Sequence, residues 1–203
     1  MGKSYDGIDA KLGDWIEQQH LFFVASAPLA EDGHVNVSPK GDLRWFRIIG
    51  PREVAYLDFV GSGAETIAHA RENGRIVVMF CAFDGPPRIV RLHGRASVLL
   101  PDEEGFDELL AHFDPPEHAL RSLIRVEVTR IADSCGYGVP LMRFDGTRTQ
   151  QEAWQDKMMR SGGFDDYIAE KNSASIDGLP AISGLTGNIR RGPGNATGQT
   201  TRS

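Results

Sequence analysis

A succession of short strand-like segments joined by short connections is the feature of this sequence that most constrains its fold. Runs of aliphatic and aromatic residues, or alternation of such residues with polar ones, predict about seven strands. These segments span residues 21–27, 34–39, 43–49, 52–60, 76–81, 89–99 and 124–131. Short connections favour antiparallel pairing, because a parallel crossover needs a dozen or more residues. Gly94, inside the sixth segment, indicates a bulge or a bend at a barrel corner. The pattern predicts a small closed or split antiparallel barrel.

Two of the segments indicate how the sheet is used. The segment 76–81 is apolar on both faces, which is typical of a central strand. The segment 52–60 alternates, so its two faces are expected to have different surroundings. One face carries Ala55, Leu57 and Phe59, and the other carries Val54, Tyr56 and Asp58.

Helices are predicted beside the strands. Ser62 followed three residues later by Glu65 predicts a capping box that opens a helix reaching about Asn73. Further helices are expected over residues 9–19 and 101–113, and two short ones over residues 149–171. The predicted fold class is mainly β with flanking helices (α+β).

The segments suggest one folded unit with additions at both ends. We expect an N-terminal helix at 1–19, a barrel domain at 20–140, a C-terminal helical extension of that domain at 141–182, and a disordered tail at 183–203. The tail is rich in glycine and has few large apolar residues, so it cannot offset the entropy lost on ordering.

Charge argues against several classes of partner. The 22 basic and 28 acidic residues give a net charge of −6, and the three arginines of the tail leave −9 on the rest of the chain. Such a balance is not typical of a nucleic-acid-binding protein. No apolar run approaches the roughly 20 residues of a membrane helix, and the N-terminal residues lack the apolar core of a secretory signal. We therefore expect a cytoplasmic protein with neither a nucleic-acid nor a membrane partner.

Most familiar chemical motifs are missing from the sequence. There is no complete glycine-rich dinucleotide fingerprint and no Walker motif. The six histidines lack metal-binding spacing, and two cysteines are too few for a cysteine-rich zinc site, so no metal is expected. Cys81 is expected to be a buried hydrophobic residue, and Cys135 an exposed thiol without a nearby base.

Two segments remain as a candidate anion site. In residues 35–42 a strand ends in Ser38, Pro39 and Lys40, and in residues 58–66 a strand runs into the start of a helix. A helix N-terminus offers free amide donors to a phosphate, and a lysine offers a point charge. The residues alone leave open the simpler interpretation, a strand-end turn beside an ordinary capped helix.

The order of these motifs resembles the pyridoxamine 5′-phosphate oxidase-like family, the flavin-binding split barrels. The resemblance is carried by the segments 37–42, 54–58, 61–66, 73–76, 94–96, 135–140 and 175–180. It implies an antiparallel split β-barrel of the FMN-binding type, and a homodimer that binds FMN at its subunit interface.

The resemblance also implies where the cofactor binds, without naming a catalytic residue. The cofactor-binding positions would be Asn36, Val37, Ser38, Lys40, Asp58, Ser62, Thr66 and Arg88. Trp45, Tyr56 and Tyr137 are candidates for stacking on the flavin ring. The family's oxidases carry an Arg-Lys pair at the start of the helix, where this chain has Ala64 and Glu65, and Glu65 would repel a phosphate.

Three functions are compatible with these observations. The first is a flavin-dependent oxidoreductase acting on a small organic substrate, or its variant with a deazaflavin coenzyme. The second is a non-catalytic carrier that binds flavin or haem. The third is a structural dimer that has lost cofactor binding, which the missing Arg-Lys pair suggests.

Overall fold

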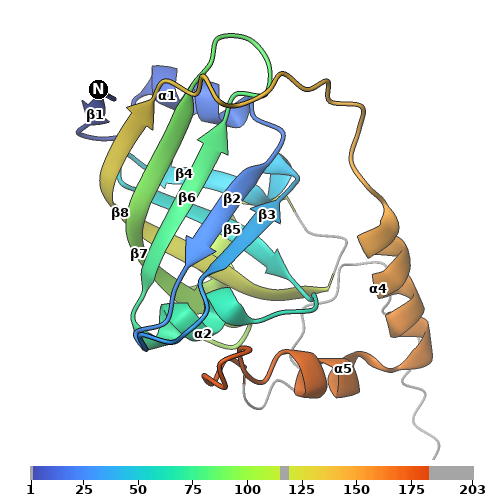
Figure 1. Cartoon of the computed structure of the whole chain (residues 1–203). Helices are drawn as coiled ribbons and strands as arrows, with labels where there is room; N and C mark the ends of the chain where they lie inside the picture. Colours follow the sequence, from blue (N-terminus) through green and yellow to red (C-terminus); the bar gives the residue numbers. More distant parts are fainter. Residues whose placement is uncertain (1, 115–118, 183–203) are drawn as a thin grey trace, which may run out of the picture.

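The computed structural model describes residues 2–114 and 119–182 (Figure 1). Its elements are β1 (Ser4–Tyr5), α1 (Ala10–Glu17), β2 (Phe22–Ser26), β3 (Asn36–Lys40), a 3-10 turn η1 (Leu43–Trp45), β4 (Phe46–Gly50), β5 (Glu53–Phe59), α2 (Glu65–Glu72), β6 (Arg75–Cys81), β7 (Ile89–Leu99), α3 (Phe106–Leu110), β8 (Leu120–Ser134), α4 (Gln150–Ser161) and α5 (Phe164–Lys171). The tail predicted at 183–203 lies outside the described residues.

The strands form one antiparallel sheet that curves into a barrel (Figure 1). Their order is β3-β2-β6-β7-β8-β5-β4, and β1 pairs with β8. The strands β3 and β4 are consecutive in the chain but lie at opposite ends of this order, joined by residues 41–45. The predicted mainly β, antiparallel split barrel is confirmed.

Gly94 forms the predicted irregularity in β7. The register between β7 and β8 shifts between His93 and Gly94. A Cβ atom on Gly94 would lie 2.3 Å from the carbonyl oxygen of Glu127, so a larger residue would push the two strands apart. The bulge bends β7 where the sheet turns, as expected for a glycine in a strand.

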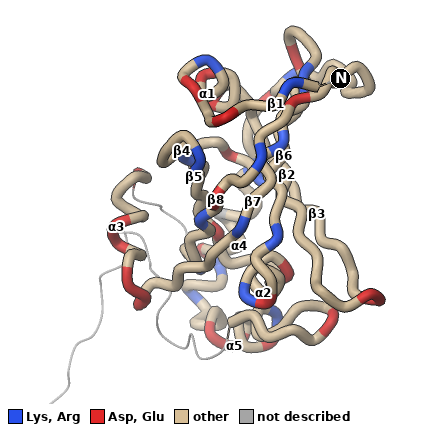
Figure 2. Tube along the Cα trace, turned by 90° about the vertical axis from the view of Figure 1, so that its left-hand side faces the viewer, with Lys and Arg blue, Asp and Glu red and all other residues tan. Residues whose placement is uncertain are grey.

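The two faces of β5 enter two different hydrophobic clusters, as the alternation predicts. Val54 and Tyr56 lie in the barrel interior with Phe22. Ala55 and Leu57 lie on the outer side, in a cluster that α3 covers. Figure 2 shows acidic residues on α3, which carries apolar residues toward the barrel and charge toward solvent.

Three predicted boundaries differ from the structure. Of the helix expected over 101–113, only α3 forms. Gly105 adopts a left-handed conformation (φ +84°), and a right-handed helix cannot extend through such a residue. The segment expected as a strand from residue 43 begins with η1, since the side chain of Asp42 accepts a hydrogen bond from the amide of Arg44. The last strand extends beyond 124–131, because β8 also pairs with β1 and the end of β5.

The residues after the barrel pack against one end of it. Phe164 and Ile168 of α5 form a cluster with Val60 and Ala119. Farther along, Ala181 and Ile182 are buried in the cluster of the barrel interior. This extension therefore lies against the ends of β5 and β8, where the candidate site is found.

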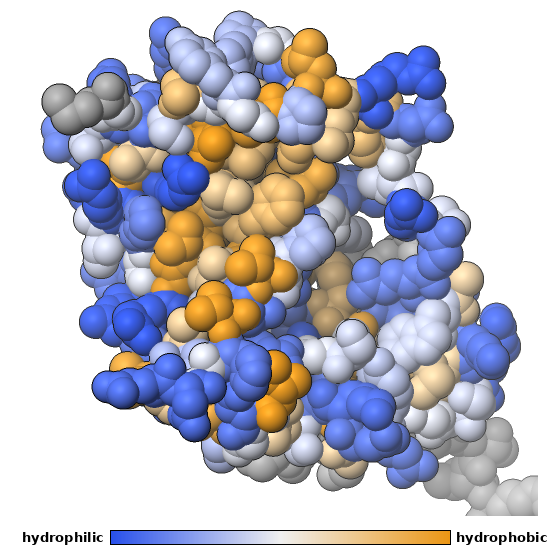
Figure 3. Space-filling model, in the orientation of Figure 1, coloured by the Kyte–Doolittle hydropathy of each residue, from blue (hydrophilic) through white to orange (hydrophobic). Residues whose placement is uncertain are grey.

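The outward side of β3 is apolar. Val37 is 60% exposed, and Val35, just before the strand, is 69% exposed. Figure 3 shows hydrophobic residues gathered over the front of the barrel. Within residues 2–114 and 119–182, no helix combines the length and the apolar character needed to span a membrane.

Candidate functional site

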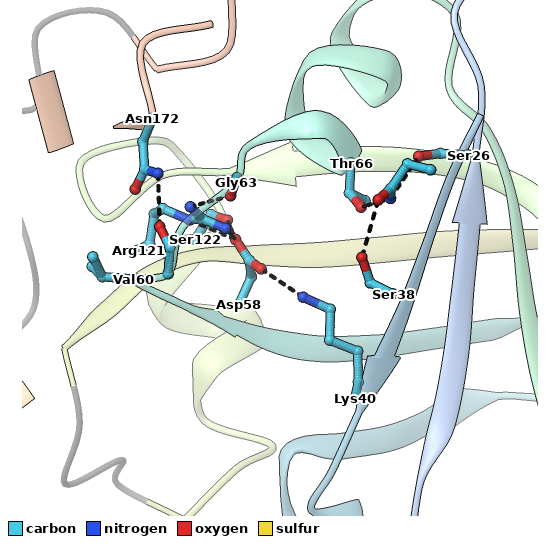
Figure 4. Close-up of polar contacts among 12 residues, drawn as sticks. Ser26, Ser38, Lys40, Asp58, Val60, Gly63, Thr66, Arg121, Ser122 and Asn172 are labelled. Carbon is cyan, nitrogen blue, oxygen red and sulfur yellow. Dashed lines mark hydrogen bonds and ion pairs between the residues drawn. The ribbon is translucent and has the colours of Figure 1, made fainter. Parts of the chain in front are cut away.

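A buried carboxylate, Asp58 near the end of β5, organises the site (Figure 4). Its Oδ2 accepts hydrogen bonds from Arg121 Nε (2.9 Å) and Ser122 Oγ (3.0 Å), and Arg121 Nη2 lies 2.8 Å away. Its Oδ1 lies 3.4 Å from Nζ of Lys40, at the end of β3. Two cations thus share this one carboxylate, so the cluster of Asp58, Arg121 and Lys40 by itself carries one positive charge in excess.

The electrostatics of Asp58 follow from these partners. Asp58 is 2% exposed, and burial alone would raise the pKa of its carboxyl group. The positive charges of Arg121 and Lys40 and the hydrogen bonds to the carboxylate outweigh burial and hold that pKa below its ordinary value. Asp58 is therefore ionised at neutral pH, and it holds Lys40 in place.

The turn between β5 and α2 has its carbonyl groups occupied and its amides free. Side chains of Gln155, Asn172 and Arg121 donate to the carbonyl oxygens of Val60 (3.4 Å), Gly61 (2.9 Å) and Gly63 (2.8 Å). The backbone N–H groups of residues 61–64 have no hydrogen-bond partner among the described residues. Successive unpaired amides of this kind form an anion-binding concavity.

The expected capping box is absent, which corrects the prediction for this turn. The helix α2 begins at Glu65, its N-cap is Ala64, and no side chain caps it. Glu65 is thus the first residue of the helix instead of the third, because the turn that Arg121 holds at Gly63 extends to residue 64. Ser62 lies in the turn itself.

A second polar network lies beside Lys40. Asn36 donates through Nδ2 to Thr66 Oγ1 (3.1 Å), and its Oδ1 accepts from Ser38 Oγ (3.1 Å). Behind it, Ser26 Oγ shares a hydrogen bond of 3.0 Å with Nδ1 of His69. Burial lowers the pKa of His69, so this histidine is neutral at pH 7. The network fixes the two hydroxyl groups of Ser38 and Thr66.

One cavity of about 360 Å³ is lined by the cluster around Asp58, by the turn after β5, and by Ser38 and Thr66. Its walls come from the end of β3, the end of β5, the turn after it, the start of α2, Arg121 and Gln151. A cavity of about 700 Å³ adjoins it, and the two share Asp42, Trp45 and Phe59. The smaller cavity is lined by the cations Lys40 and Arg121 and by the carboxylates of Asp42, Asp58 and Glu65. The larger cavity offers aromatic side chains.

The structure brings together most of the predicted site residues. Ser38, Lys40, Asp58, Ser62 and Thr66 line the same cavity, and Asn36 is hydrogen-bonded to two of them.

Two predicted site residues lie elsewhere within the protomer. The side chain of Val37 points outward from β3, because neighbouring residues of a strand face opposite sides. Arg88 lies beside Tyr5 and Asp133, where it donates to the Tyr5 hydroxyl at 2.7 Å. Among the stacking candidates, Tyr56 is fully buried and Tyr137 is 81% exposed, and only Trp45 lines the cavities.

Arg121 is the residue that the sequence analysis missed. It lies at the start of β8, is 4% exposed, and contacts both Asp58 and the turn. The signal that could have found it is an arginine with apolar residues on either side, Ala119 and Leu120 before it and Leu123 and Ile124 after Ser122, since a buried arginine requires an acidic partner. The described residues hold no group of three or more His, Cys, Asp or Glu arranged for a metal ion.

Comparison with known proteins places the barrel in a family. The sequence model described as pyridoxamine 5′-phosphate oxidase matches residues 8–135. The pyridoxamine 5′-phosphate oxidase family protein ustO of Aspergillus flavus is 37% identical over 192 residues, which cover 88% of this chain and 77% of that protein.

Solved structures with a similar fold include HupZ of Group A Streptococcus (18% identity, 67% of this chain and 99% of that one, TM-score 0.49). Another is an FMN-binding protein of Syntrophomonas wolfei (20% identity, 60% of this chain and 78% of that one, TM-score 0.43). The family match covers more than half of the chain, and the relative aligns over most of it. This protein belongs to the pyridoxamine 5′-phosphate oxidase family.

Proposed function

We propose that this protein binds FMN and acts as a flavin-dependent oxidoreductase on a small organic substrate. The observation that carries the proposal is the cavity that residues 61–63, whose amides are free, and Lys40 line together. Amides and a lysine are the donors that proteins use for a phosphate. Family membership supports flavin as the molecule that carries this phosphate.

The polar residues present fit a phosphate group with one exception. The hydroxyl groups of Ser62 and Thr66 add donors to the amides and to Lys40, whereas Ser38 donates its hydroxyl proton to Asn36. The charge of Asp42 is balanced by Arg44, whose Nε donates to it at 2.8 Å. Glu65 is the exception, because its carboxylate belongs to the wall of the same cavity and lies against Gly63.

The chain's own residues would bind and orient the cofactor. When bound, FMN supplies the electron or hydride transfer itself. Asp58 holds Lys40 toward the phosphate, and Asn36 orients the hydroxyl groups of Ser38 and Thr66. Trp45 provides an aromatic face at the boundary of the two cavities, where a flavin ring can stack. No side chain is assigned as an acid or a base.

A homodimer forms part of the proposal. The exposed Val35 and Val37 give the front of the barrel an apolar surface (Figure 3). A surface of this kind is typical of a contact between proteins. In a dimer built on it, the cofactor would lie at the subunit interface, as in the resemblance to flavin-binding split barrels.

Absorbance spectroscopy of the purified protein tests the cofactor. We expect a yellow protein, or one that becomes yellow with added FMN, with the flavin absorbance bands. A Soret band would favour a haem carrier, and a protein that binds neither cofactor would contradict the proposal. Light scattering provides the oligomeric state, and a monomer that binds FMN would contradict an interface site.

A redox assay then separates an enzyme from a carrier. The FMN-loaded protein is mixed anaerobically with a nicotinamide donor, and the flavin absorbance is followed. We expect bleaching, and recovery of the absorbance when an oxidising substrate is added. If the bound FMN is neither reduced by a donor nor reoxidised by a substrate, the result would favour a non-catalytic carrier.

A further inference from the structure

We propose that Gln155 and Asn172 are positioning residues that hold the turn 60–63 in its phosphate-binding conformation. Both belong to the extension after the barrel, beyond the residues 8–135 that match the family. The inference rests on the proposed function, since it assigns these side chains a role toward the phosphate of FMN.

Gln155 of α4 joins the ends of two strands. Its side chain is buried, with the residue 1% exposed. Its Oε1 accepts from the backbone amide of Ala119 (2.8 Å), and its Nε2 donates to the carbonyl oxygen of Val60 (3.4 Å). Val60 itself donates to the carbonyl oxygen of Ala119 (3.1 Å). The amide group of Gln155 thus adds to the contact where β5 and β8 end.

Asn172 holds the next peptide of the turn (Figure 4). The residue is fully buried, and its Nδ2 donates to the carbonyl oxygen of Gly61 at 2.9 Å. Its backbone is fixed on both sides: its amide donates to Ile168, and its carbonyl oxygen accepts from Ile182. The side chain that reaches Gly61 therefore extends from a rigid part of the extension.

Peptide geometry connects these two contacts to the free amides. In a planar trans peptide the N–H of one residue points away from the carbonyl of the residue before it. With the carbonyls of Val60 and Gly61 held toward the helices, the N–H groups of Gly61 and Ser62 face the opposite side. From the barrel, Arg121 donates to the carbonyl oxygen of Gly63. The carbonyl oxygens of Val60 and Gly61 accept their hydrogen bonds from the extension, which therefore orients these two peptides.

Packing of α5 against Val60 and Ala119 would, by itself, give the extension a purely structural role. The two roles differ in what they predict for ligands with and without a phosphate. Loss of packing weakens every ligand of the cavity, whereas a turn that presents its amides less well weakens only a ligand with a phosphate.

The test compares FMN with riboflavin, which lacks the phosphate. Kd for each is measured by flavin fluorescence on the wild-type protein and on the variants Gln155→Met, Asn172→Ala and Asn172→Asp. The last keeps the shape of the side chain but replaces the donor to Gly61 with an acceptor. Lys157→Ala and Ser173→Ala, at exposed neighbouring positions, are the controls.

We expect each test variant to raise Kd for FMN about tenfold, the loss typical of weakened hydrogen bonds to a charged group. Kd for riboflavin should change less than twofold, and the controls should match the wild type. Equal weakening of both ligands, or unchanged preference for FMN, would overturn the positioning role. If Asn172→Asp unfolds because it buries a carboxylate against a carbonyl oxygen, Asn172→Ala and Gln155→Met decide the test.

The same data separate failure of this inference from failure of the proposed function. A wild-type protein that binds FMN no better than riboflavin would show that the cavity does not hold the phosphate, which contradicts the proposed site. A wild-type protein that prefers FMN, with variants that keep this preference, would contradict only the role of Gln155 and Asn172.

Discussion

The two ends of β8 carry the same kind of ion pair in different surroundings. At its start, Arg121 pairs with Asp58, and at its end Asp133 pairs with Arg88. The side chains of the first pair are 5% and 3% exposed, and those of the second are 23% and 20% exposed. The buried pair has an additional cation, Lys40, facing the cavity.

The difference separates the end of β8 that belongs to the proposed binding site from the end that is joined to β1. At the more exposed end, Asp133 accepts hydrogen bonds from the backbone amide of Lys3 and the hydroxyl of Tyr5, so the cluster fastens the N-terminal strand to β8. At the buried end, burial of Asp58 and Arg121 costs desolvation energy. There the second cation, Lys40, faces the cavity in which we propose that an anion binds.

Removal of each arginine gives the largest expected contrast. Arg121→Met leaves Asp58 buried with only Lys40 and Ser122, and we expect a loss of about 3–5 kcal/mol in the free energy of unfolding. Arg88→Met leaves Asp133 partly in water, and we expect a loss of about 1 kcal/mol or less. Urea unfolding at pH 7 measures both. Similar losses would mean that burial does not distinguish the two pairs.

A double variant sharpens the same contrast. Adding Asp58→Leu to Arg121→Met removes the unpaired charge, and we expect it to recover much of the lost stability, since apolar contacts replace buried ion pairs well. FMN binding should not recover with it, because Lys40 then has no carboxylate to hold it in place. Recovery of both would contradict the role given to Asp58.

Truncation of Lys40 should affect binding more than stability. Lys40→Met removes the charge that faces the cavity while Arg121 still neutralises Asp58. We expect Kd for FMN to rise about 10- to 100-fold, the range for a lost charge-assisted contact of about 1.5–3 kcal/mol. Fluorescence titration measures it, with the exposed Lys11→Met as the control. Unchanged affinity would remove Lys40 from the site.

The parts of the fold that follow from local patterns could be predicted from the sequence. The alternation in β5 is a property of neighbouring residues, and it correctly separates the face of Tyr56 from the face of Leu57, which lie in two different clusters. Gly94 likewise marks a bulge because only glycine fits so close to the facing strand. The antiparallel pairing of strands joined by short connections, such as β4 with β5 and β6 with β7, also follows from the sequence.

The parts that depend on distant residues could not be predicted. The start of α2 looked like a capping box, but Arg121, far along the chain, holds the turn before it and moves the start of the helix. Gln155 and Asn172 carried no local signal either, because each is an ordinary polar residue until the extension meets β5. Arg88 was assigned to the site by resemblance, and within the protomer it lies beside Asp133.

Acid should weaken the two ion pairs in the same direction but to different extents. The pKa of Asp58 and that of Asp133 are both below the ordinary value of 3.8, so each carboxylate stabilises the fold above that pH. This stability is lost as the pH falls through the lowered pKa of the folded state. Urea unfolding from about pH 6 to about pH 3 measures the loss.

Neutral variants identify which pair causes the acid loss. We expect Asp58→Asn to be less stable than the wild type at pH 6, with the difference shrinking toward pH 3, where the carboxyl of the unfolded wild-type chain binds a proton. Asp133→Asn should show the same trend with a smaller difference, because its cluster is more exposed. A constant difference across the range would contradict the lowered pKa of Asp58.

The smallest expected effect concerns the one acidic residue that opposes an anion at the buried end. Glu65→Gln keeps the size of the side chain and removes a negative charge from the wall of the cavity. We expect FMN to bind about two- to fivefold more tightly at low salt, while α2 loses about 0.3–1 kcal/mol because an acid in the first turn stabilises a helix. Riboflavin affinity should not change, and Glu104→Gln, on an exposed turn, should change neither ligand. Tighter binding of FMN, with riboflavin affinity unchanged, would mean that Glu65 weakens an anion site that binds the phosphate. Weaker binding of FMN would mean that Glu65 itself helps to hold the cofactor.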